Sequence, residues 1–296
     1  MSNGQRPSFL ERAQALDRRV IFVFIALAVS LPLLFHVIFP ERISPIVASM
    51  FERIEALPEG SRVLISFDYS PSTVPEVQPM VDAVIRHCAA RKQKLYLMAL
   101  WGTGQNIADE TIHRVIETEF PDYKYGQDYL NIGYKSGNQG VINVILTDLK
   151  KMYTTDVNGT AIDSIPMMSS IRNLKNFDII FTFGGGFPGT KEWVLFAGDP
   201  GKIPVASGVT AVQAPLLYPY YPSQLLGLMG GIKGAAEYES ELINRHPRFA
   251  DTPHPAIDMM GPQAVAHLVI MLFIVLGNAA YFATRRRQQD SGKAGA

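Results

Sequence analysis

Two runs of about twenty uncharged residues, one near each end of the chain, constrain its fold more than any other feature. Residues 20–39 and residues 264–283 contain no Asp, Glu, Lys or Arg. An α-helix of that length rises about 30 Å, which matches the thickness of the hydrocarbon core of a bilayer. We therefore predict two transmembrane helices, with a folded domain of residues 40–263 between them.

A cleavable signal peptide is the alternative interpretation of the first run. Its apolar stretch is longer than a typical signal-peptide core, and no small-residue cleavage site follows Phe39. A signal-anchor is the better reading, with a kink at Pro32 of the kind that membrane helices tolerate. The first run is thus expected to stay in the mature protein and to span the bilayer.

Basic residues flanking the two runs predict the orientation of the chain. They are more frequent outside the runs, in residues 1–19 and 284–296, than in the segments that join the runs to the domain. By the positive-inside rule both termini are cytoplasmic tails and the domain is extracytoplasmic. The expected location is a bacterial inner membrane, with the domain in the periplasm. The outer basic residues are Arg6, Arg12, Arg18, Arg19, Arg285, Arg286, Arg287 and Lys293.

The charge balance excludes one class of partner. The chain has 27 basic and 27 acidic residues, so its formal net charge is zero. A general nucleic-acid binder needs a basic excess to gain from neutralising phosphates, and none is present. The single cysteine, Cys88, excludes an internal disulfide and a multi-cysteine metal site.

Short apolar segments alternate with helical segments between the two runs. This alternation predicts an α/β domain, Rossmann-like and three-layered, with a mainly parallel sheet and a transmembrane helix on either side. The strand segments are apolar throughout, as expected for strands that are buried on both faces. A ClpP-type serine-protease fold is the alternative. The expected strands are 62–68, 94–101, 129–134, 177–183 and 202–208.

Helices are expected between these strands and at both ends of the domain. Residues 44–57 have apolar side chains at spacings of three and four, which predicts an amphipathic helix. A proline-rich linker is expected over residues 245–262, before the second run. The other expected helices are 74–91, 107–119, 141–152 and 223–238.

Loops rich in glycine and small polar residues follow all five predicted strands. In a doubly wound sheet, ligands bind beyond the carboxyl ends of the strands. Glycine lets backbone amides approach an anion or a carbonyl oxygen closely. Ordinary turn chemistry is the alternative for each loop, because sharp turns require glycine anyway. The predicted ligand-binding residues are Ser70, Gly102, Gly104, Gly137, Gly184, Gly185, Gly186 and Thr210.

Three side chains on these loops and strand ends are candidates for catalysis. Asp68 ends a strongly apolar strand, where burial would raise the pKa of its carboxyl and suit it to proton transfer. The alternative is that Asp68 caps the following turn. Ser207 and Lys135 are candidates for a nucleophile and its base. The histidines show no metal-ligand spacing, so neither a metal nor another cofactor is predicted.

The predicted helix 223–238 carries glycines four residues apart, Gly227 with Gly231 and Gly230 with Gly234. A glycine face of this kind favours close contact between helices. The contact would be either with the domain's own sheet or with another subunit at the membrane surface.

These observations leave three functional hypotheses. The first is a structural or assembly module, tethered to the lipid bilayer, that associates with itself or with other membrane proteins. The second is a membrane-anchored hydrolase that uses Asp68, Lys135 or Ser207. The third is a small-ligand-binding domain in the same glycine-rich crevice. The first is preferred because the sequence shows no arrangement of nucleophile, base and orienting group.

Overall fold

The computed structural model describes residues 17–39 and 41–293 of the chain. The chain divides into two compact units. One unit is formed by residues up to Phe39 together with those from Asp258, and the other by Pro40–Ile257. Residues 1–16 and 294–296 of the predicted tails, and the charges that they carry, lie outside the described residues.

Pro40–Ile257 is built around a six-stranded, all-parallel sheet with the strand order β3-β2-β1-β4-β5-β6. This is the order of doubly wound nucleotide-binding folds, in which the chain reverses direction across the sheet between the first and fourth strands. The predicted α/β class with a parallel sheet is therefore confirmed. The strands are β1 (Arg62–Asp68), β2 (Lys94–Ala99), β3 (Tyr129–Tyr134), β4 (Ile179–Gly184), β5 (Val205–Val209) and β6 (Gly227–Gly230).

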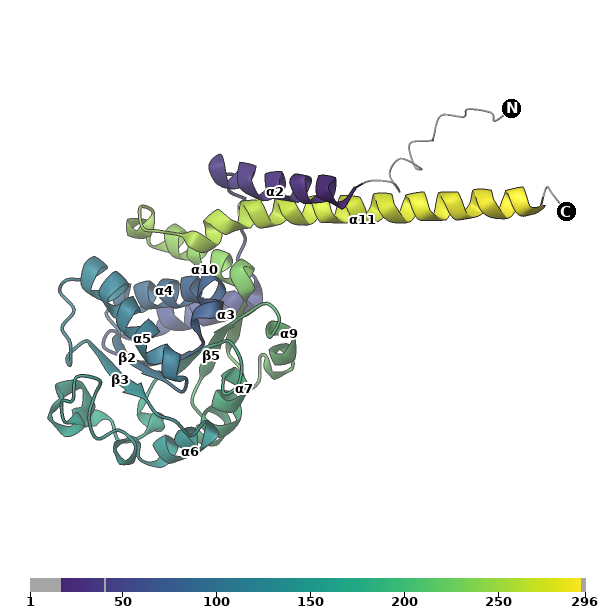
Figure 1. The fold of residues 1–296 in the computed structure, drawn as a ribbon. Helices are drawn as coiled ribbons and strands as arrows, with labels where there is room; N and C mark the ends of the chain where they lie inside the picture. Colours follow the sequence, from purple (N-terminus) through teal and green to yellow (C-terminus); the bar gives the residue numbers. More distant parts are fainter. Residues whose placement is uncertain (1–16, 40, 294–296) are drawn as a thin grey trace. The chain divides into compact units, whose positions relative to one another are not determined.

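Helices cover both faces of the sheet (Figure 1). On one face lie α3 (Pro45–Ala56), α4 (Val74–Ala90), α5 (Gly102–Thr111) and α10 (Gly231–Arg245). On the other lie α6 (Gln139–Thr147) and α7 (Thr190–Trp193). Two further short helices are α8 (Asp199–Gly201) and α9 (Ala214–Leu217). A π-helical segment, Ile112–Glu117, continues α5.

Burial on both faces explains why β1 reads as a continuous apolar segment. Six of its seven residues are buried, whichever face their side chains point to. Leu64 packs with Tyr96 of β2 and Ile142 of α6 in the core on the α6 face. Such a strand has no solvent face that would require polar residues, so its sequence does not alternate.

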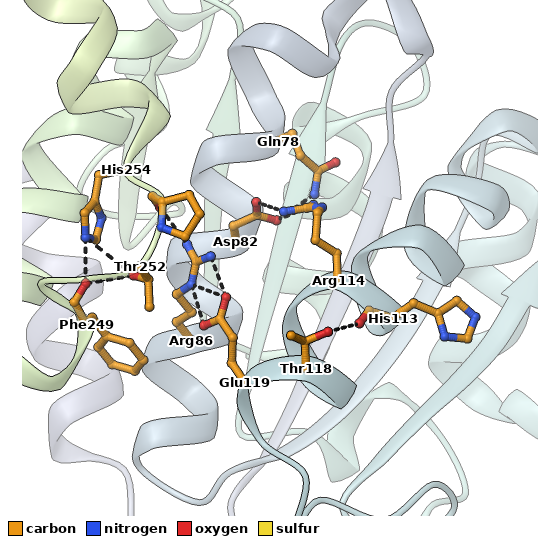
Figure 2. Close-up of polar contacts among 11 residues, drawn as sticks. Gln78, Asp82, Arg86, His113, Arg114, Thr118, Glu119, Phe249, Thr252 and His254 are labelled. Carbon is orange, nitrogen blue, oxygen red and sulfur yellow. Dashed lines mark hydrogen bonds and ion pairs between the residues drawn. The ribbon is translucent and has the colours of Figure 1, made fainter. Parts of the chain in front are cut away.

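Ion pairs hold α4 against the segment that follows α5 (Figure 2). Arg86 donates three hydrogen bonds to the Glu119 carboxylate, at 2.7, 2.8 and 3.1 Å, and a fourth to the carbonyl oxygen of Pro253 at 3.3 Å. Arg114 makes a second bidentate pair with Asp82. The paired carboxylates and guanidiniums fix the register between the two helical segments.

The largest difference from the predicted secondary structure lies between residues 223 and 238. A single helix is predicted there, but residues 227–230 form β6 and α10 begins only at Gly231. Gly231 has φ +63°, a conformation that glycine adopts without steric cost, and it turns the chain from strand to helix. The prediction of one continuous helix is wrong because the four residues of β6, two of them glycine, have no recognisable strand pattern.

The other unit contains α2 (Arg18–Leu34) and the part of α11 (Pro255–Lys293) that lies beyond Ile257. Within it, the Phe24 and Phe273 rings lie 5.8 Å apart. Val37 approaches Gly261 so closely that a Cβ on the glycine would lie 1.8 Å from the Val37 carbonyl oxygen. Because later residues of α2 and its extension meet earlier residues of α11, the two run antiparallel, side by side (Figure 1).

Among the described residues, one helix is long and apolar enough to cross a membrane, α11 over Pro255–Arg285. The helix α2 has 17 residues and ends at Leu34, five residues before the predicted end of the first span at Phe39. The prediction of two spanning helices is thus supported, by length and composition, for the C-terminal helix alone. α11 also begins inside the predicted linker 245–262, whose first part contains the short helix Pro247–Phe249.

Candidate functional site

The carboxyl end of β1 carries Asp68, the carboxylate on which the catalytic hypothesis depends. Its oxygens accept hydrogen bonds from the Leu100 amide, from Ser66 Oγ and from Trp193 Nε1, each at 2.8 Å. Thr182 Oγ1 lies 3.4 Å away. Asp68 is fully buried, and these bonds connect β1 to the end of β2 and to α7.

Burial raises the pKa of the Asp68 carboxyl from 3.8 to about 6, and the four hydrogen bonds counteract this effect only in part. Within the described residues, no lysine, arginine or histidine forms an ion pair with Asp68. All of its partners are neutral donors that belong to the framework of the domain. In the structure Asp68 therefore links neighbouring strands and is not exposed to solvent, and a catalytic role for it stays a prediction.

Ser207, on β5, belongs to a row of buried polar side chains that crosses the neighbouring strands. We refer to Ser66, Asp68, Thr182 and Ser207 as the polar layer. Its register partner on β4 is Thr182, which in turn pairs with Ser66 of β1. Ser207 Oγ donates to the carbonyl oxygen of Thr182 at 2.9 Å and lies 2.5 Å from Thr190 Oγ1. The hydroxyl is fully buried, so a substrate does not reach it in this conformation.

Lys135 lies apart from this layer. Its ammonium nitrogen is 5.7 Å from the centroid of the Tyr153 ring. Among the described residues it forms no hydrogen bond or ion pair with Asp68 or Ser207. The structure therefore connects Asp68 and Ser207 through Thr182 but does not assemble the predicted serine–lysine pair.

A cleft of about 580 Å³ lies above the polar layer, at the carboxyl ends of the central strands. It is at the point where the chain reverses direction across the sheet, which is where doubly wound folds bind their ligands. α5 begins here at Gly102, and no side chain caps its first turn. The lining residues are Ser70, Leu100, Trp101, Gly102, Thr103, Tyr134, Phe187 and Pro188.

The connection from β1 to α4 differs from a phosphate-binding loop. It contains no glycine, and prolines at positions 71 and 75 remove two backbone N–H groups from the start of the helical segment. A helix start binds phosphate through such N–H groups. The cleft therefore lacks the phosphate cradle that dinucleotide-binding domains place at this position.

A second cleft, of about 350 Å³, adjoins the loop after β4. Phe187 borders both clefts and is 61% exposed, while Leu216 borders the second and is 72% exposed. Val212, on the loop after β5, is 84% exposed. We refer to these three side chains, Phe187, Val212 and Leu216, as the apolar rim.

The predicted ligand-binding residues divide between the clefts and the framework. Ser70 and Gly102 line the first cleft, and Gly186 lines the second. The others are not among the cleft residues. Gly104 is required for packing, since a Cβ there would lie 1.9 Å from the Phe67 carbonyl oxygen. The remaining four are Gly137, whose φ is +140°, Gly184 at the end of β4, Gly185 beside Thr73, and Thr210, whose carbonyl oxygen accepts from Gln213.

The four glycines predicted to make helix contacts do not share one helix. Gly227 and Gly230 are the first and last residues of β6, and Gly231 and Gly234 belong to α10. Each lies against another part of Pro40–Ile257. A Cβ on them would come within 3 Å of, in turn, Ile46, Ala214, Ala211 and Met229. Their small size is thus explained by packing within the domain.

Sequence reasoning missed a cluster formed by Glu55, His87 and His246. One ligand atom from each residue lies within 4.8 Å of the other two. The three side chains come from α3, α4 and the end of α10, all on the same face of the sheet. Their separations in the sequence match no metal-binding motif, so no signal short of the fold would have found them.

The sequence matches no model of a known protein family and no curated protein. Two observations in the structure bear on function. Asp68 and Ser207, beneath the carboxyl edge of the sheet, are hydrogen-bonded to other residues of the domain, whereas large apolar side chains at the same edge are exposed.

Proposed function

We propose that Pro40–Ile257 is a non-catalytic assembly module, held at a membrane, which associates with a second copy of the chain through the apolar rim. The supporting observation is the exposure of Phe187 on the loop after β4, of Val212 on the loop after β5, and of Leu216 on α9. Full burial of one such side chain contributes about 1.5–3 kcal/mol, so its exposure in an isolated subunit is costly. Apolar patches with polar surroundings are typical of protein interfaces.

The state of the polar groups below the rim supports binding rather than catalysis. A nucleophile or general base must be within reach of a substrate atom. Asp68 and Ser207 are fully buried and already bonded to framework groups. A hydrolase that uses them would first have to open the polar layer.

The anchor determines which partner the rim meets. α11 is proposed to span the bilayer, with α2 inserted beside it, both termini cytoplasmic and the domain outside the cytoplasm. Large apolar side chains on both helices are exposed, among them Phe22 at 67% and Val275 at 63%. The antiparallel contact of the two helices is compatible with termini on the same side. Copies anchored in this way share one orientation in the membrane, which is compatible with a symmetric dimer.

The test is the oligomeric state of the full chain in a mild detergent, with chemical crosslinking in native membranes. Wild type is expected to run as an oligomer, and Leu216→Asp as a monomer, because the charge would be buried in the interface. Leu195→Asp is the matched control: Leu195 is an exposed apolar side chain, 37% accessible, outside the rim. This variant is expected to keep the oligomer.

Two outcomes would contradict the proposal. One is a wild-type monomer in membranes and in detergent. The other is a complex with a different membrane protein that Leu216→Asp leaves intact.

Binding of a small ligand is the second candidate function. It is favoured by the cleft of about 580 Å³, which residues from the ends of four strands line at the reversal point of the sheet. A ligand that occupies it would raise the thermal stability of the chain in proportion to the logarithm of its concentration. Trp101→Ala should abolish that stabilisation without dissociating an oligomer, which separates the two functions.

A further inference from the structure

We propose that Glu55, His87 and His246 form a binding site for a divalent transition metal ion of the Zn²⁺ type. Two histidine nitrogens and one carboxylate oxygen are a common set of three protein ligands for zinc, with a fourth position left for water or another ligand. The site lies on the face of the sheet that α3, α4 and α10 cover. It shares no residue with the two clefts at the carboxyl edge.

The spacing of the ligand atoms carries the inference. Glu55 Oε1 lies 3.1 Å from His87 Nε2 and 2.6 Å from His246 Nε2. Zinc–ligand bonds of about 2.0–2.2 Å in a tetrahedral site separate neighbouring ligand atoms by about 3.3 Å. An ion would therefore replace the two hydrogen bonds after Glu55 Oε1 and His246 Nε2 move apart by about 0.7 Å and the two histidine nitrogens, now within 4.8 Å of each other, adjust to the same spacing. His246 lies just beyond the last helical residue of α10, where the side chain is 19% exposed and has room to move.

The surrounding residues fix the orientation of the buried ligand. His87 is fully buried and its ring packs against Phe51 at a tilt of 33°, with ring centroids 4.2 Å apart. Its second ring nitrogen, Nδ1, lies 2.7 Å from the Tyr238 hydroxyl. This bond is the outer-shell contact that metal-bound histidines make, since it holds the ring and sets which nitrogen faces the ion.

Arg91 fixes the carboxylate in a complementary way. Its Nε lies 3.6 Å from Glu55 Oε2, and Nη2 donates to the Glu55 carbonyl oxygen at 2.9 Å. Oε2 is thus directed toward the guanidinium, and Oε1 is left for the two histidines. Glu55 would bind an ion through one oxygen. The partial exposure of Glu55 and His246 puts the fourth coordination position toward solvent.

The chemistry of the ligand set selects among cations. Mg²⁺ and Ca²⁺ prefer six or more oxygen ligands, and the cluster offers one carboxylate oxygen. Imidazole nitrogen suits Zn²⁺ and its neighbours in the first transition series. Bound metal would join α3, α4 and the end of α10, which are far apart in the sequence.

The experiment uses the full chain, purified in detergent without a polyhistidine tag and treated with EDTA. Equilibrium dialysis against Zn²⁺, followed by elemental analysis, is expected to give one zinc per chain and none of Mg²⁺. His246→Ala should weaken zinc binding at least a hundredfold. Tyr238→Phe should weaken it by about tenfold, the lower end of the effect of losing an outer-shell contact.

His113→Ala is the matched control. His113 is an exposed histidine whose Nδ1 lies 2.6 Å from Glu117 in the i,i+4 position, a carboxylate–histidine pair outside the cluster. This variant should bind zinc like wild type. Circular dichroism of each variant checks that the fold is retained, and Co²⁺ absorption in the visible range provides a second reading of a four-coordinate site.

The proposal is overturned if wild type binds no more zinc than His246→Ala, or if His113→Ala loses as much affinity as His246→Ala. It is also overturned if Co²⁺ gives the spectrum of a six-coordinate ion in water.

Discussion

Carboxylates that are buried or half-buried are stabilised in two different ways, one at the carboxyl edge of the sheet and the other on its α4 face. At the edge, Asp68 is held by neutral donors from neighbouring strands and from α7. On the α4 face, Glu119 and Asp82 are each held by an arginine (Figure 2). A neutral environment penalises the charged form of a carboxylate, whereas an arginine favours it. The same residue type therefore responds differently to mutation and to pH in the two regions.

The largest effect is expected for Asp68→Ala. The substitution leaves the Leu100 amide and the Trp193 indole N–H buried without an acceptor, and each such group costs about 1–3 kcal/mol. We expect the free energy of unfolding to fall by about 4 kcal/mol, measured by equilibrium denaturation of the full chain in detergent. Asp122→Ala, at an exposed aspartate, should change it by less than about 0.5 kcal/mol. Equal effects of the two substitutions would show that the polar layer does not hold the sheet edge together.

The pH dependence of stability tests whether Asp68 lacks a stabilising cation. The pKa of its carboxyl is about 6 in the folded state, raised by burial from 3.8. Between pH 4 and pH 6 the folded state binds more protons than the unfolded state, so stability falls as pH rises. This contribution is about 3 kcal/mol and is fully present only below pH 4. Asp68→Ala should therefore cost more at pH 4 than at pH 7, and a cost that grows with pH would contradict the expectation.

Glu239 should make the stability of the fold decrease with rising pH over a higher pH range than Asp68 does. Burial raises the pKa of its carboxyl from 4.5 to about 8, partly offset by a hydrogen bond from the Ile257 amide at 3.0 Å. Its contribution to stability is present below pH 4.5 and is lost as pH rises to 8.

The arginine-held carboxylates should show a graded and smaller effect. Arg86 is 3% exposed, so Arg86→Ala leaves Glu119 and the Pro253 carbonyl oxygen unpaired near the interior, at a cost of about 3 kcal/mol. Arg114 is 49% exposed, and its buried partner Asp82 keeps the hydrogen bond from Gln78, so Arg114→Ala should cost about 2 kcal/mol, less than Arg86→Ala. Raising the salt concentration should weaken the Arg114 pair more than the Arg86 pair. Thermal unfolding of both variants at two salt concentrations measures these costs. A larger cost for Arg114→Ala than for Arg86→Ala would contradict the expectation.

Sequence patterns predicted the parts of the fold that repeat. β1 and β3 were predicted over their full extents, and α4 within one residue, because apolar segments and helical spacing are local signals. β6 was missed because it has four residues and two glycines. The start of α5 was predicted near residue 107 because glycine is a poor helix former, but the helix begins at Gly102. Gly104 is tolerated inside it because only glycine allows the close approach to Phe67.

The candidate site was predictable only where the topology places strand ends together. The loops that line the clefts were expected at the carboxyl edge of the sheet, and two of the predicted glycines, Gly102 and Gly186, line the clefts. The hydrogen bonds that occupy Asp68 and Ser207 come from Trp193 and Thr190 on α7, and no pattern in the sequence indicates that contact. The cluster of Glu55 with His87 and His246 depends on how three helices pack, which local spacing does not encode.

The pairing of β1 with β4 has a consequence for how the chain is made. The last register pair joins Asp68 to Gly184, and 116 residues separate them. At a synthesis rate of about 5–20 residues per second, β1 waits roughly 6–23 seconds for its neighbour. During that interval a strand with five consecutive apolar or small side chains, Val63 to Phe67, has only β2 paired with it, and its other edge is open. The nascent chain therefore passes through a stage in which an apolar strand with an unpaired edge is open to aggregation.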